Sequence, residues 1–203
     1  MRIEIPLFTG FDEVDAIGPF EVLGNAAHVV DDLEVVLVGA HEAGEVVAGH
    51  GLRVQTDAAL SAAADLVLVP GGGWQSDLPG AKGVRREFDS GVLPARLAEL
   101  AAGGAVMASV CTGALLLAKA GLLAGRPATT HRGQLDDLEA MGALVDREAR
   151  VVDDGDLLTC GGVTSGIDLA MWIVERELGA EVAASVARVM EYERGSTVWT
   201  RPS

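Results

Sequence analysis

Aromatic residues make up only 4% of the 203-residue chain, which leaves too few rings for a base-stacking platform. Basic residues are also scarce, because 15 Lys and Arg stand against 30 Asp and Glu, and the formal net charge is −15. Nucleic acids and anionic membranes are bound through a basic footprint, which this charge disfavours. No apolar run approaches the roughly 18 residues needed to cross a bilayer. Glu4 and Pro6 also interrupt the N-terminus early, unlike the apolar stretch of a secretory signal. We therefore expect neither a nucleic-acid nor a membrane partner.

Cysteine occurs only twice, as Cys111 and Cys160. Two cysteines so far apart do not resemble a disulfide framework, so we expect a reduced, cytoplasmic protein. The four histidines show no metal-ligand spacing with one another or with a cysteine. The sequence therefore does not indicate a metal site.

The remaining composition is that of a folded globular protein, with 49% apolar and 22% charged residues. The length suits a single domain. Short apolar runs alternate with segments of helical spacing, and this predicts an α/β fold with a mostly parallel sheet covered by helices on both faces. The expected strands are residues 3–8, 33–38, 66–69, 105–110, 128–130, 151–152 and 157–159, with a small hairpin over 46–55. The expected helices are residues 16–27, 93–102, 113–120, 134–141 and 164–178, with a last helix ending near 190 and a loose tail over 194–203.

A possible nucleophile stands at the junction between an expected strand and an expected helix. The strand at 105–110 leads into Ser109-Val110-Cys111-Thr112-Gly113, a small-x-nucleophile-x-Gly pattern typical of a nucleophile elbow. The N–H groups at the start of the following helix favour a thiolate, so we expect a Cys111 pKa below the free value of about 8.5. The alternative is a buried structural cysteine, which is the role we expect for Cys160.

Three other segments supply candidate partners for this cysteine. Pro70-Gly71-Gly72-Gly73 follows a buried strand, and an N–H there, with that of Thr112, could hold a developing anion beside the sulfur. Asp15 precedes an expected helix, where a carboxylate is usually an N-cap; the alternative is a carboxyl held against the thiol. His131 either faces the pocket or hydrogen-bonds within its loop.

At these residues the sequence resembles the DJ-1/PfpI superfamily. The matching stretches are residues 15–23, 68–72, 109–113, 128–131 and 158–168. Each stretch alone is a weak signal, but together they are specific and span nearly the whole chain. The resemblance implies a flavodoxin-like three-layer sandwich over residues 1–193, related to class I glutamine amidotransferases, followed by a tail over 194–203. It also implies a homodimer with the active site near the interface.

Within the superfamily the chain is most similar to the isocyanide hydratase branch. That branch has Cys-Thr at the elbow, matched by Cys111-Thr112, and an Asp partner, matched by Asp15. The resemblance therefore implies that Cys111, Asp15 and Thr112 are catalytic. It assigns substrate or oxyanion binding to Gly71, Gly72 and His131.

The implied reaction converts an isocyanide and water to an N-substituted formamide through a cysteine thioimidate, with no metal or organic cofactor. One alternative is a glyoxalase-like or deglycase-like enzyme that acts on small aldehydes, although no His follows Cys111. The other is a redox sensor or regulatory ligand-binding protein, since an accessible thiolate is also readily oxidised. The same elbow occurs in AraC-type transcription regulators. Those carry a basic helix-turn-helix after this domain, which is not found before Ser203, so we expect no DNA-binding role.

Overall fold

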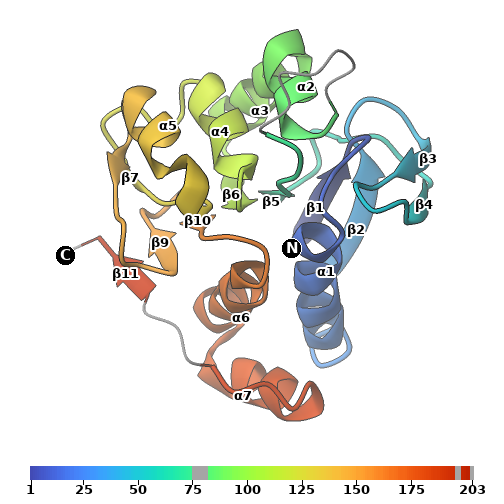
Figure 1. Ribbon diagram of the computed structural model, residues 1–203. Coiled ribbons are helices and arrows are strands. Elements are labelled where there is room, and N and C mark those ends of the chain that lie inside the picture. The colour runs from blue at the N-terminus through green and yellow to red at the C-terminus, as the bar shows by residue number, and fades with distance from the viewer. Residues whose placement is uncertain (75–81, 195–197, 202–203) are drawn as a thin grey trace.

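The computed structural model describes residues 1–74, 82–194 and 198–201, and a seven-stranded sheet forms its centre (Figure 1). The strands of this sheet are β1 (Arg2–Leu7), β2 (Glu34–Gly39), β5 (Leu66–Val69), β6 (Val106–Val110), β9 (Val151–Asp153), β10 (Leu157–Cys160) and β11 (Val198–Thr200). Their order is β11-β9-β10-β6-β5-β1-β2. The five strands from β10 to β2 are parallel, whereas β9 runs antiparallel to β10 and parallel to β11. The predicted mostly parallel sheet is confirmed.

Helices cover both faces of the sheet, which confirms the predicted three-layer architecture. The helices are α1 (Glu13–Ala27), α2 (Val84–Ser90), α3 (Val92–Ala102), α4 (Gly113–Lys119), α5 (Leu135–Ala140), α6 (Ser165–Leu178) and α7 (Ala180–Val189), with a 3-10 turn at Arg132–Gln134. Helix α1 packs against α6 and α7, while α2, α3 and α4 pack against one another (Figure 1). None of the helices in the described ranges is both long and apolar enough to cross a membrane.

The core lies around the central strands. All four residues of β5 are buried, as are five of the six residues of β1. A strand covered on both faces has no solvent side, so its sequence is almost continuously apolar rather than alternating. The continuously apolar run at Leu66–Val69 therefore predicts a buried central strand, and β5 has the same bounds.

Two small sheets flank the main one. The antiparallel pair β3 (Gly44–Val47) and β4 (Arg53–Thr56) confirms the predicted hairpin. The parallel pair β7 (Pro127–Ala128) and β8 (Leu144–Val145) coincides with the strand expected over 128–130 only at Ala128.

The structure differs from the sequence analysis in three further elements. Helix α1 begins at Glu13 rather than at residue 16, so Pro19 lies in its second turn and not near its start. Helix α2 was not predicted at all. The segment expected to be a loose tail contributes β11, which pairs with β9 at the edge of the sheet.

The carboxyl ends of four neighbouring parallel strands meet at one edge of the sheet. Asp12 follows β1, Gly71 follows β5, Cys111 follows β6 and Val163 follows β10. Ligands of open α/β sheets bind outside the carboxyl ends of the strands. The fold therefore places the candidate residues from distant parts of the sequence in one location.

Candidate active site

Cys111 forms the predicted strand-to-helix elbow. Its backbone has a φ of +55°, in the left-handed region that non-glycine residues rarely adopt. The Cys111 N–H donates to Gly161 O at 3.0 Å, and Thr130 Oγ1 donates to Cys111 O at 2.6 Å. These two bonds hold the peptide groups on both sides of the strained residue. A strained backbone conformation of this kind persists only where the surrounding contacts hold it in place, and such residues are common at active sites.

Gly113 makes the sharp turn possible because no side chain fits at its position. A Cβ there would lie 2.4 Å from Val69 O and 2.9 Å from Pro70 O. The backbone at the end of β5 thus lies directly against the first turn of α4. The glycine of the small-x-Cys-x-Gly pattern is required by this close approach.

Asp15 lies in the first turn of α1 and is completely buried. The N-cap of the helix is Asp12, not Asp15, so the cap interpretation of Asp15 is wrong. The Gly71 N–H donates to Asp15 Oδ2 at 2.9 Å, while Oδ1 has no hydrogen-bond partner among the described residues. Burial and the nearby Asp12 charge raise the pKa of Asp15 from 3.8 to about 7, although Gly71 and Cys111 oppose the rise.

The Cys111 thiol is also buried, with only 7% of the residue exposed. Burial and the Asp15 charge raise the pKa of Cys111 to about 12, even though the N–H groups of Val163 and Thr112 contact the sulfur and lower it. The predicted pKa below 8.5 is therefore wrong. Desolvation and neighbouring carboxylates outweigh the helix N-terminus.

The two acidic groups consequently form a pair that keeps at least one proton at neutral pH. Cys111 is a thiol in the resting state, and Asp15 titrates close to neutrality. A carboxyl with a pKa near the working pH can both accept and donate a proton. The arrangement is suited to a nucleophile that is deprotonated only as it attacks.

Thr112, Gly71 and Gly72 connect the elbow to the glycine loop. The Gly72 N–H donates to Thr112 Oγ1 at 3.0 Å, and Thr112 Oγ1 lies 3.3 Å from Gly72 O. The Gly71 N–H is engaged by Asp15, as described above. Both glycine N–H groups thus position protein groups, which differs from the oxyanion contact expected of them. Of the N–H groups predicted to face the sulfur, that of Thr112 contacts it.

Val163 is a site residue that the sequence analysis did not single out. Its φ is +41°, which is exceptional for a β-branched residue, and its N–H contacts the Cys111 sulfur. Nothing in the run Gly161-Gly162-Val163 indicates that the valine rather than a glycine adopts this conformation. The role becomes visible only when β10 is placed beside β6.

His131 lines the Cys111 cavity and also hydrogen-bonds within its own loop. Its Nδ1 accepts from the Gly133 N–H at 3.1 Å and lies 2.9 Å from Gln134 Oε1. The ring packs over Gly162, where a Cβ would lie 2.5 Å from His131 Cδ2.

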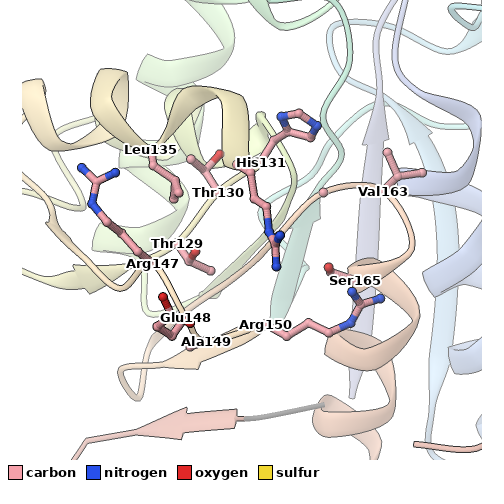
Figure 2. A pocket seen from close by; sticks show the side chains of 13 residues that line it. Thr129, Thr130, His131, Leu135, Arg147, Glu148, Ala149, Arg150, Val163 and Ser165 are labelled. Atoms are coloured by element: carbon pink, nitrogen blue, oxygen red, sulfur yellow. The ribbon is translucent and has the colours of Figure 1, made fainter. Parts of the chain in front are cut away.

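Two cavities meet at His131 and Val163. One, of about 350 Å³, is lined by Cys111, Thr112 and Gly72 and opens beside Trp74. The other, of about 320 Å³, extends past Arg150 to Arg147, as Figure 2 shows. Arg147 pairs with Asp136 and Glu139, and Arg150 pairs with Asp168. The cavity that contains Cys111 is therefore the candidate substrate site.

Cys160 lies in the core, as predicted, with no exposed surface. Burial raises its pKa well above the usual value. Within the described ranges, no group of three His, Cys, Asp or Glu side chains is arranged to hold a metal ion.

Substituting Gly71 with alanine tests how tightly the site is assembled. The new methyl would lie 2.6 Å from Asp15 Oδ2 and 2.8 Å from Thr112 N and Oγ1. We expect Gly71→Ala to destabilise the fold by about 1–3 kcal/mol. We also expect it to lower kcat/KM roughly 10²-fold for any reaction that uses Cys111, because misplacement by about 1 Å has this effect. Urea denaturation and steady-state kinetics measure the two effects.

Gly24→Ala is the matched control, since a Cβ at this helical position meets nothing within 4 Å. The free energy of unfolding of this variant should be about 0.5–1 kcal/mol higher than that of the native protein, and its activity should be unchanged. Equal effects of the two substitutions would show that Gly71 does not position Asp15.

Comparison with known proteins gives a consistent picture. The DJ-1/PfpI family model matches residues 1–176. Isonitrile hydratase from Pseudomonas putida is 32% identical over 194 residues, which cover 95% of this chain and 78% of the hydratase. The Parkinson disease protein 7 homolog from Danio rerio is 29% identical over 190 residues, covering 91% and 94% of the two chains. The crystal structure of a ThiJ/PfpI family protein from Pseudomonas syringae has a TM-score of 0.83 at 27% identity, covering 96% of this chain and 76% of that one.

Proposed function

The chain belongs to the DJ-1/PfpI family, and from this premise we propose that it hydrates an isocyanide to an N-substituted formamide. The observation that carries the proposal is the buried pair of Cys111 and Asp15. The pair joins a strained elbow cysteine to a carboxyl whose Oδ1 has no hydrogen-bond partner among the described residues. The similarity to isonitrile hydratase supports the choice of substrate.

The first half of the reaction forms a thioimidate. As the Cys111 sulfur attacks the terminal carbon of R–NC, the Asp15 carboxylate accepts the thiol proton. Asp15 then gives this proton to the same carbon, so an S–C and a C–H bond form and the S–H bond breaks. The N–H groups of Thr112 and Val163 stabilise the negative charge that develops on the sulfur during the attack.

The second half releases the product. Water adds across the C=N bond of the thioimidate, with its oxygen bonding to carbon and a proton going to nitrogen. The C–S bond of this tetrahedral species then breaks, the carbonyl forms, and the hydroxyl proton returns to the sulfur through Asp15. The products are R–NH–CHO and the free thiol.

Purified protein incubated with cyclohexyl isocyanide should form N-cyclohexylformamide. In ¹⁸O-labelled water the label should enter the formyl oxygen, and gas chromatography with mass spectrometry measures both. Methylglyoxal, with lactate as the readout, is the parallel substrate for the glyoxalase-like alternative. Formamide at the level of the protein-free blank, or lactate formation without formamide, would overturn the proposal.

The homodimer implied by the resemblance remains part of this proposal. Sedimentation equilibrium of the purified chain measures it directly, and a single monomeric species would contradict it.

A further inference from the structure

Asp12 caps helix α1 and also lines the Cys111 cavity. It caps α1, because its Oδ1 accepts from the Val14 N–H at 3.1 Å. Its own N–H donates to Gly71 O at 2.9 Å, which fixes it beside the glycine loop. Its half-buried side chain lines the cavity together with Cys111.

The charge of Asp12 is not compensated inside this cavity. Asp12 is the one acidic residue among the described residues that line it, and neither Lys nor Arg is among them. Among the described lining residues, the imidazole of His131 is the one side chain that can carry a positive charge. At the rim, Trp74 donates its indole N–H to Asp137 Oδ2 at 2.8 Å, and the Arg85 guanidinium lies 5.1 Å from the centre of its ring, so the rim carries one charge of each sign. The charge inside the cavity is therefore that of Asp12.

We propose that Asp12 is a specificity residue that favours substrates bearing a positive charge near the reacting carbon and disfavours anionic ones. The substrate class is then an isocyanide with an ammonium group. A charge in a partly buried cavity acts more strongly than one in water, because the effective dielectric constant is lower. The effect of the Asp12 charge reaches the reacting groups, since it raises the pKa of both Asp15 and Cys111. The substrate class rests on the proposed function, whereas the charge selectivity at the sulfur does not.

The selectivity can be measured on the thiol itself, without any isocyanide. Trimethylammonioethyl and sulfonatoethyl methanethiosulfonate are cationic and anionic reagents of similar size. The Cys111 sulfur attacks the divalent sulfur of the reagent and forms a disulfide with it. The bond from that sulfur to the sulfonyl group breaks, methanesulfinate leaves, and the buffer takes up the thiol proton. Intact-mass spectrometry follows the rate, and each rate is divided by the rate of the same reagent with free cysteine. Cys111→Ser provides the blank, because Cys160 has no exposed surface.

We expect the corrected rate to be about tenfold higher for the cationic than for the anionic reagent in the native protein. Asp12→Asn removes the charge and keeps a good helix cap, and it should reduce this ratio to about threefold or less. Asp12→Ser is a second neutral cap in case the first variant folds poorly. Asp31→Asn is the matched control, because it makes the same change in net charge at an exposed position outside the cavity.

The same variants separate this inference from the proposed activity. An unchanged ratio in Asp12→Asn and Asp12→Ser, or an equal fall in Asp31→Asn, would show that overall charge and not Asp12 sets the selectivity. Formamide yields from (2-isocyanoethyl)trimethylammonium and isocyanoacetate then test the substrate class, with the first preferred in the native protein and the preference lost in Asp12→Asn. A reagent ratio that depends on Asp12 without turnover of any isocyanide would support the selectivity and refute the proposed hydration.

Discussion

Replacing Cys111 with alanine should abolish formamide formation, with a fall in kcat/KM on the order of 10⁴-fold. The carbon of the isocyanide then has no nucleophile, and Asp15 alone offers only a proton. Cys160→Ala is the matched control for loss of a buried thiol. Because the Cys111 N–H contacts the Cys160 sulfur, we expect a loss of up to about tenfold, far smaller than that of Cys111→Ala. Steady-state kinetics with cyclohexyl isocyanide measure both. Comparable turnover by Cys111→Ala and the native protein would rule out the thioimidate route.

The elbow strain makes a second comparison at the same position informative. Glycine adopts a φ of +55° freely, whereas alanine and cysteine do not. Cys111→Gly should therefore be about 1 kcal/mol more stable than Cys111→Ala, although both are inactive. Urea denaturation of the two variants measures the difference. A less stable glycine variant would mean that the strain at the elbow is small.

Replacing Asp15 with asparagine should lower kcat/KM by roughly 10²- to 10⁴-fold, which is the range for loss of a general acid–base group. The amide keeps the shape and can still accept from the Gly71 N–H, but it cannot exchange a proton with Cys111. In the native protein, kcat/KM should rise as the pH passes about 7, the pKa of Asp15, and this dependence should be absent in the variant. Activity close to native in Asp15→Asn would contradict the role assigned to the pair.

The same substitution should stabilise the folded protein at higher pH. The pKa of Asp15 is raised from 3.8 to about 7 on folding, so between these values the unfolded chain releases a proton that the folded chain keeps. Stability therefore falls as the pH rises through this range, by about 4 kcal/mol in all. Asparagine does not ionise, so Asp15→Asn should be about 2–4 kcal/mol more stable than the native protein near pH 8 and nearly equal to it near pH 4.

Glu4 is the control, because folding lowers its pKa whereas folding raises the pKa of Asp15. It is equally buried, but Ser61 and Arg2 hydrogen-bond it, and despite the effect of burial they hold the pKa of Glu4 below its usual value. Glu4→Gln should therefore lower the free energy of unfolding near neutral pH. If both amide variants change stability in the same direction, the hydrogen-bonding environment is not what separates the two carboxyls.

The parallel strands and the elbow could be predicted from the sequence because local patterns determine them. A short, continuous apolar run followed by glycines, such as Leu66–Val69, favours a doubly covered strand, and the small residues around Cys111 allow a sharp turn. Helix α2 was missed because it is short and charged. Its Glu87 is nevertheless buried, and its carboxylate lies 2.8 Å from Nε2 of His41 in a distant segment.

The electrostatics of the site could not be predicted in the same way. The raised pKa of Cys111 depends on burial and on Asp15, which lies 96 positions earlier in the chain. From the residues alone, a cap is the favoured role for Asp15, and only the family resemblance points to catalysis; the structure assigns the cap to Asp12. The positive φ of Val163 has no signal in its own sequence, and its contact with the Cys111 sulfur joins the segments that follow two neighbouring strands.

The pairing of β11 with β9 bears on how the chain behaves at high concentration. An uncovered strand edge exposes unpaired N–H and C=O groups, which can recruit the edge of another molecule. On this side the sheet ends in a strand of only three residues, too short to template such growth well. By pairing with β9, the last described strand satisfies the backbone groups that β9 would otherwise expose at the edge of the sheet.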